Sequence, residues 1–234
     1  MAITTVLFDL DGTLLPMDQE VFLKAYLGGL CKKLAPLGYQ PKEIADGIWA
    51  GTGAMVKNNS DLLNDQVFWQ AFCDFLGKDA RQDEPVFEDF YRNEFQQVAA
   101  ACGHTPQAKA LVDRLKARGL RLVLATNPLF PAIATHSRVR WAGLDPTDFA
   151  HITTYENSSR CKPNPAYYRE ILDKLGLRPE ECAMVGNDVQ EDGPAAQLGM
   201  PVFVLTDCLI DRTGQVDQYP HGDFRALTQW LDTL

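Results

Sequence analysis

The chain opens with an apolar run that predicts a buried strand. Residues 6–8 are apolar and follow two threonines, and Gly12 places a turn soon after them. Two carboxylates, Asp9 and Asp11, therefore lie at the carboxyl end of a core strand. In an open α/β sheet this is the side on which ligands bind.

Between residues 18 and 100 the spacing of apolar side chains changes from that of a strand to that of a helix. Four helices are predicted, centred on residues 21–34, 41–56, 68–76 and 87–98. Glycines interrupt the second of them, and nothing in this region clearly predicts a strand. The aromatic residues recur at helical spacing, which indicates a packed helical core rather than a cofactor site.

After Gly103 predicted helices and strands alternate, which is typical of βα units on a parallel sheet. Strands are predicted at residues 120–125, 151–155, 183–185 and 202–205, and helices from Pro106, Pro131, Pro165 and Phe224. The first strand must pair with strands of this second half. We therefore expect an α/β core domain over residues 1–16 and 104–234, with a helical cap domain over residues 17–103 inserted at its ligand-binding edge.

Composition narrows the function classes. The 234 residues carry a net charge of −9 and no basic tract, so nucleic acid is not an expected partner. Six cysteines lack metal-ligand spacing, which argues against zinc and against a disulfide framework. The chain runs directly into strand residues, so we expect no leader, and no apolar run approaches the roughly 20 residues of a membrane span. We expect a cytoplasmic protein without a membrane partner.

Polar side chains follow four of the predicted strands, and each has an ordinary explanation when taken alone. Thr126 fits a helix cap, Lys162 a solvated loop, and the segments at 9–12 and 186–188 fit tight turns. The carboxyl ends of parallel strands meet at one edge, however, and there these residues would combine carboxylates, hydroxyl and amide donors and a cation.

Asp9 and Asp11 are two residues apart, so a continuing strand would point both side chains the same way. Two carboxylates held that close cannot both ionise freely without a cation, and their pKa values split. We therefore expect one to stay ionised and attack, while the other carries a proton and delivers it.

Four motifs in order make the chain resemble the haloacid dehalogenase (HAD) superfamily, in its Mg²⁺-dependent phosphatase branch with an α-helical cap inserted after motif one. The motifs are Asp9-x-Asp11-Gly12-Thr13, Thr126 in Leu124-Ala125-Thr126-Asn127, Lys162 in Cys161-Lys162-Pro163, and Gly186-Asn187-Asp188-x-x-x-Asp192. The resemblance covers the whole chain. It implies a Rossmann-like parallel sheet flanked by helices as the core.

The resemblance also implies a phosphatase that hydrolyses a small phosphorylated metabolite. Asp9 would attack phosphorus and form an aspartyl-phosphate. Asp11 would protonate the leaving alcohol and then take a proton from the hydrolytic water. Thr126 and Asn127 would hold phosphoryl oxygens, and Lys162 would neutralise charge on the nucleophile and the phosphoryl group.

Mg²⁺ is the implied cofactor, since the site offers oxygen ligands. In the family it is held by the nucleophile carboxylate, here Asp9, by the backbone carbonyl of Asp11 and by a carboxylate of motif four. Many members have Asp directly after the motif-four glycine, where this chain has Asn187. We expect Asp188 to be the direct ligand, with Asn187 and Asp192 behind it.

Three other functions share parts of this pattern. Phosphomutases share the core motifs but carry a histidine about a dozen residues after the nucleophile, where this chain has Glu20, Val21 and Phe22. Metal-free dehalogenases lack the second carboxylate that Asp11 supplies. A non-turnover phospho-accepting regulator, of the receiver type, is about half this length and has no helical lid. The cap residues do not identify the alcohol, so phosphoglycolate, a sugar phosphate and a nucleoside monophosphate stay open, as does the oligomeric state.

Overall fold

The computed structural model describes residues 2–234, and in them the six strands form a single parallel sheet. The strand order is β3-β2-β1-β4-β5-β6, the Rossmann order. The strands are β1 (Thr5–Phe8), β2 (Arg121–Leu124), β3 (His151–Ile152), β4 (Cys182–Gly186), β5 (Val202–Leu205) and β6 (His221–Gly222). The predicted α/β class and the pairing of β1 with later strands are confirmed. The two-residue β6 was not predicted, because so short a strand leaves no periodic pattern.

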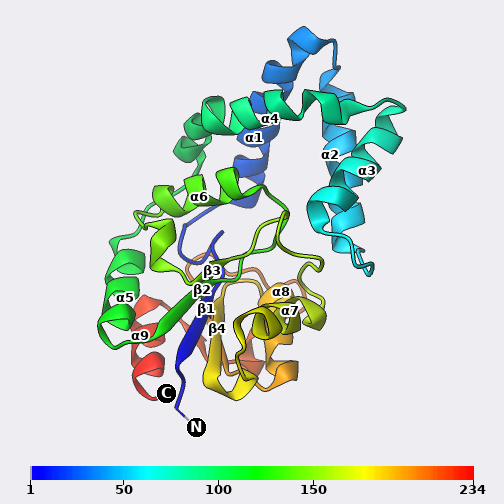
Figure 1. The fold of residues 1–234 in the computed structure, drawn as a ribbon. Coiled ribbons are helices and arrows are strands. Elements are labelled where there is room, and N and C mark those ends of the chain that lie inside the picture. The colour runs from blue at the N-terminus through cyan, green and yellow to red at the C-terminus, as the bar shows by residue number, and fades with distance from the viewer. Residues whose placement is uncertain (1) are drawn as a thin grey trace.

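Alternate strand side chains pack under two layers of helices. Val6 and Phe8 join the core beneath α5 (Pro106–Ala117), α6 (Ala132–Trp141) and α9 (Phe224–Asp232). Leu7 points to the other face, beneath α7 (Pro165–Leu175). Figure 1 shows α5 and α9 on one side of the sheet, with α7 and the short α8 (Val189–Asp192) on the other. The first strand is therefore covered on both faces, as its uninterrupted apolar run indicates.

Four helices follow β1 before the chain returns to the sheet: α1 (Gln19–Leu34), α2 (Pro41–Val56), α3 (Asn64–Leu76) and α4 (Glu84–Arg92). They lie beyond the carboxyl ends of the strands, while both termini lie at the opposite end of the sheet (Figure 1). Asp18 begins α1 by accepting hydrogen bonds from the amides of Glu20 and Val21. Along residues 2–234 no helix is long and apolar enough to cross a membrane.

Two predicted elements differ from those observed. The fourth helix, predicted over residues 87–98, is broken: α4 ends at Arg92, and a 3₁₀ segment, Glu94–Ala101, follows it. Asn93 leaves the helical conformation with φ −112° and ψ −82°, and the Gln96 side chain instead donates to the Tyr91 carbonyl. The strand predicted at residues 151–155 is only the two-residue β3, because the chain turns away after Ile152.

The sheet register brings three strand ends to the same level. Phe8 pairs with Leu124 on one side and with Val185 on the other. The backbone continues this register, since the Asp9 amide donates to the Val185 carbonyl at 2.9 Å. The strand order changes direction at β1, between β2 and β4, which is where parallel α/β sheets open a crevice for ligands.

Candidate active site

The centre of the site is a buried lysine held between two carboxylates. Lys162 Nζ donates to Asp9 Oδ1 at 2.8 Å and to Asp192 Oδ1 at 2.7 Å. Burial on its own would lower the pKa of Lys162, but the charges of Asp192 and Asp9 outweigh it and raise that pKa well above its usual value. The lysine is therefore a permanent cation, which an acidic protein needs in order to hold an anion.

The second oxygen of Asp9 meets the motif-one and motif-four turns. Thr13 Oγ1 lies 3.2 Å from Asp9 Oδ2 and 3.0 Å from Asn187 Oδ1. The Asn187 amide nitrogen donates to the Cys208 carbonyl at 2.7 Å. Gly12 leaves room for this amide: its φ is +88°, and a Cβ there would lie 2.2 Å from Asn187 Nδ2.

Asp11 is paired with Arg138 of α6, which the sequence analysis missed. Arg138 Nη1 donates to Asp11 Oδ2, and the guanidinium lies 4.4 Å from the centre of the Phe130 ring. Asp11 Oδ1 is buried without a hydrogen-bond partner. Burial raises the pKa of Asp11, Arg138 opposes that rise and Asp9 adds to it, so the pKa lies above its ordinary value. Such a carboxyl is suited to carrying a proton.

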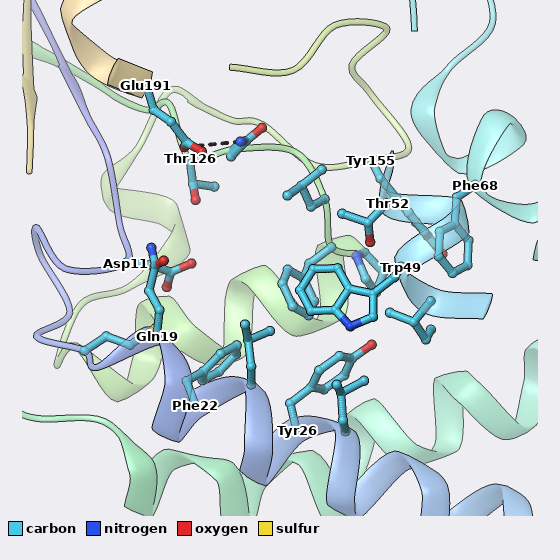
Figure 2. Close-up of a pocket in the computed structure, with 18 of the residues that line it drawn as sticks. Asp11, Gln19, Phe22, Tyr26, Trp49, Thr52, Phe68, Thr126, Tyr155 and Glu191 are labelled. Atoms are coloured by element: carbon cyan, nitrogen blue, oxygen red, sulfur yellow. Dashed lines mark hydrogen bonds between the residues drawn. The ribbon is translucent and has the colours of Figure 1, made fainter. Parts of the chain in front are cut away.

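Thr126 and Asn127 begin the loop after β2. The Thr126 carbonyl accepts a hydrogen bond from the Tyr167 hydroxyl at 2.8 Å, and its side chain lines the cavity described below (Figure 2). Asn127 Oδ1 accepts from the Lys162 amide at 3.2 Å, while Asn127 Nδ2 donates to Glu191 Oε2 at 3.2 Å. The motif-two and motif-three loops are thus tied together next to Asp9.

Glu191 is a second residue that the sequence analysis missed. It lies on α8, among the motif-four residues, and its side chain reaches the cavity beside Thr126 (Figure 2). Burial raises its pKa to about 7 against the attraction of Lys162. The only sequence signal was its place between Asp188 and Asp192, and nothing there indicated which way the side chain points.

The motif-four carboxylates have separate partners. Asp188 caps α8 by accepting from two amides of that helix, and Arg212 Nη1 lies 3.0 Å and 2.8 Å from its two oxygens. Asp192 Oδ2 accepts from the Asp188 amide at 3.0 Å, while its other oxygen faces Lys162. Asn187 contacts Thr13 next to Asp9, whereas the Asp188 carboxylate is engaged by Arg212 and α8.

The oxygen atoms near Asp9 are suitable ligands for a hard cation such as Mg²⁺. Three protein oxygens are available here: the Asp9 carboxylate, the Asn187 side-chain carbonyl and the Asp11 backbone carbonyl. The Asp11 carbonyl accepts no hydrogen bond from any group in residues 2–234. In the same residues no three His, Cys, Asp or Glu side chains gather as metal ligands. Mg²⁺ is commonly held by one or two carboxylates together with waters and phosphate oxygens, so this smaller set of protein oxygens suits it.

A cavity of about 310 Å³ connects these residues with the inserted helices. Asp9, Asp11 and Thr126 lie at one end of it. Its other walls are rich in aromatic side chains, namely Phe22, Tyr26, Trp49, Phe68, Trp69, Phe87, Tyr91, Phe130 and Tyr155. Figure 2 shows Phe22 and Tyr26 rising from α1 and Trp49 reaching in from α2.

Comparison with known proteins gives a consistent result. The model of the haloacid dehalogenase-like hydrolase family matches residues 3–199. Phosphoglycolate phosphatase of Rhodospirillum rubrum is 30% identical over 86% of this chain and 78% of its own, and that of Yersinia pestis is 28% identical over 88% and 82%. A HAD phosphatase structure from Thermococcus onnurineus has a TM-score of 0.58 at 20% identity, covering 99% of this chain and 98% of its own.

Proposed function

The chain belongs to the haloacid dehalogenase-like hydrolase family and is a phosphatase, and from this premise we propose that it hydrolyses the phosphomonoester of a small metabolite with the help of Mg²⁺. The observation that carries the proposal is Lys162, held 2.8 Å from an Asp9 carboxylate that opens into the same cavity as Asp11 and Thr126. This arrangement puts an anionic nucleophile, a cation and a proton carrier around one space.

The reaction has two steps. An Asp9 oxygen attacks phosphorus, the bond to the ester oxygen breaks, and Asp11 gives that oxygen its proton. Water then attacks the phosphorus of the aspartyl-phosphate and Asp11 takes a proton from it. The bond between phosphorus and the Asp9 oxygen breaks, which frees inorganic phosphate and restores the Asp9 carboxylate. Lys162 offsets the negative charge in both steps, and Thr126 and Asn127 hold phosphoryl oxygens at the end of β2.

For the metal, we propose the Asp9 carboxylate and the Asp11 carbonyl as two of the ligands. Motif four supplies the third, which is either Asp188, the carboxylate that we expect from the sequence, or its neighbour Asn187. Asn187 holds the position at which many family members have Asp, and it contacts Thr13 next to Asp9. When bound, Mg²⁺ would neutralise charge on the phosphoryl oxygens. Titrating Mg²⁺ into Asn187→Ala and Asp188→Ala variants distinguishes the two, since the ligand's loss weakens metal activation more.

The test is release of inorganic phosphate from a panel of phosphorylated metabolites. Wild type should turn over repeatedly with Mg²⁺ and stop when the metal is chelated. Asp9→Asn should lower turnover by more than about 10³-fold while the protein stays folded, because the nucleophile is gone. Turnover by a folded Asp9→Asn protein, or turnover without metal, would contradict the nucleophile or the cofactor assignment respectively.

The alternatives are separated by the same assay. A phosphomutase would convert a sugar phosphate without net phosphate release, but residues 20–22 provide no histidine, and Phe22 instead faces the cavity. A regulator that only accepts phosphate would release it once per molecule at most. The division into a core of residues 1–16 and 104–234 and a cap of 17–103 also stands as our proposal, as do a cytoplasmic location and the absence of nucleic-acid and membrane partners.

A further inference from the structure

The end of the cavity at Asp9, Asp11 and Thr126 is polar and charged, whereas its other walls are mainly aromatic. Seven of the nine aromatic side chains come from α1, α2, α3 and α4, while Phe130 and Tyr155 come from the segments after β2 and β3. Most of the nine are buried against one another. Phe22 and Tyr26 stack with ring planes 10° apart, and Phe130 meets Tyr26 edge-on with ring centres 5.2 Å apart. Such walls offer flat and edge-on surfaces on which another ring can pack.

The cavity has no cation for an acidic leaving group. No lysine or arginine within residues 2–234 lines it, whereas Asp9, Asp11 and Glu191 do. Arg138 does not line the cavity; its guanidinium donates a hydrogen bond to Asp11 and packs over the Phe130 ring. A carboxylate placed among these side chains would be desolvated without a partner and would face like charges, which is unfavourable.

The polar groups of the wall are few beside its aromatic and aliphatic side chains. The hydroxyls of Tyr26 and Tyr91 lie 2.9 Å apart and hydrogen-bond to each other. The inserted helices also bring Gln19, Thr52 and the indole nitrogens of Trp49 and Trp69 to the cavity, and Trp69 Nε1 is buried without a hydrogen-bond partner among residues 2–234. A leaving group rich in hydroxyls would therefore lose more hydrogen bonds to water than the wall returns.

From this wall we propose that the alcohol released by the enzyme is uncharged and aromatic. The proposal rests on the proposed phosphatase function and specifies its substrate. The volume of about 310 Å³ lies at the lower end of small-molecule sites, which span roughly 300–1,000 Å³. It suits a phosphate group with one ring system. Glycolate, the leaving group implied by the names of the two relatives, matches this wall poorly because it is small and charged.

The experiment compares three esters of primary alcohols, namely benzyl phosphate, ethyl phosphate and phosphoglycolate, each with wild type and Mg²⁺. Because none is an activated aryl ester, differences report on binding of the leaving group. We expect kcat/KM for benzyl phosphate to exceed that for the other two by about 100-fold, the effect of burying one ring. Equal or better hydrolysis of phosphoglycolate or ethyl phosphate would overturn the proposal while leaving the phosphatase function intact. No hydrolysis of any ester would instead refute the proposed function, and the inference with it.

Variants of two exposed aromatic residues test whether the cavity wall causes the preference for benzyl phosphate. Trp49 lines the cavity but is 52% exposed, so Trp49→Ala should fold and should raise KM for benzyl phosphate by about tenfold. Phe75 is 49% exposed on α3 and lies outside the cavity, and Phe75→Ala should leave all three esters unaffected. An unchanged KM in Trp49→Ala, or an equal change in both variants, would contradict the assignment of this wall.

Discussion

The guanidinium of Arg138 and the carboxylate of Asp11 meet across 127 residues of sequence. Arg138 is only 1% exposed, although nothing in the spacing of α6 marks it as buried or functional. Its partner depends on how α6 packs against the turn after β1. The pair leaves Asp11 Oδ1 free of hydrogen bonds, so Arg138 fixes one oxygen of the carboxyl and leaves the other for proton transfer.

We expect Arg138→Met to lower kcat by about 100-fold, because Asp11 loses the donor that orients it. KM should change little, since Arg138 does not line the cavity. Arg138→Lys should recover part of kcat by keeping a donor in place. Steady-state kinetics on any ester that the wild type hydrolyses provide the measurement.

The matched control for this prediction is Arg140→Met, on the same helix but exposed. It should behave as wild type. If Arg138→Met folds normally and keeps its kcat, or if Arg138→Lys is no better than Arg138→Met, then Arg138 serves only packing and the positioning role is wrong.

At the scale of residues, the sequence predicted that the polar side chains after several strands gather at one edge of the sheet, and the structure brings Asp9, Asp11, Thr126 and Lys162 together there. It missed Arg138, Glu191 and Arg212, because each acts through a contact that tertiary packing creates. Asp188 and Asn187 could not be told apart, since a turn can direct either of two adjacent side chains toward Asp9.

At the scale of elements, the turn after β1 depends on a glycine for two separate reasons. Gly12 has a φ of +88°, a left-handed conformation that side chains disfavour. A Cβ there would also lie 2.2 Å from the Asn187 amide. Gly38, after α1, has a similar φ of +86° but no atom within 4 Å of a Cβ. A substitution at Gly38 therefore introduces backbone strain alone, whereas one at Gly12 introduces both backbone strain and a steric clash.

We expect Gly38→Ala to lower the free energy of unfolding by about 1 kcal/mol, the cost of a left-handed alanine. Gly12→Ala should cost about 1–3 kcal/mol more, because Asn187 must move, and should also abolish turnover. Urea denaturation of both variants provides the comparison. Equal losses of stability, with turnover retained in Gly12→Ala, would show that Asn187 is not held in this place.

Several elements were predicted with their observed bounds, among them α2, although glycines interrupt its pattern, and the four-residue β5. The errors arose where a single contact overrides the pattern. Asn93 breaks the fourth helix although apolar spacing continues through Val98. The four-residue α8 was missed because its capping residue, Asp188, belongs to a motif that also fits a turn.

At the scale of the whole molecule, the dependence of stability on pH should involve two partly buried histidines, His136 on α6 and His151 on β3. Burial lowers the pKa of His136, with help from Arg140, and burial lowers the pKa of His151, with help from Lys174. The unfolded chain therefore takes up more protons than the folded one as the pH falls through 6.5, the ordinary histidine value. Their contribution to the free energy of unfolding is complete above that pH and is lost below it.

Glu191 has the opposite effect on stability. Its pKa is raised to about 7 in the folded protein, so its protonation below that pH increases the free energy of unfolding. Because the two effects oppose each other, the change of the free energy of unfolding with pH in the wild type does not isolate the histidines. A comparison with histidine variants does. Between about pH 7.5 and about pH 5.5, a His136→Gln/His151→Gln protein should lose less stability than wild type. His221→Gln, at an exposed position on β6, is the control and should follow wild type. A double variant as pH-sensitive as wild type in urea denaturation would mean that neither histidine is held in its neutral form by the fold.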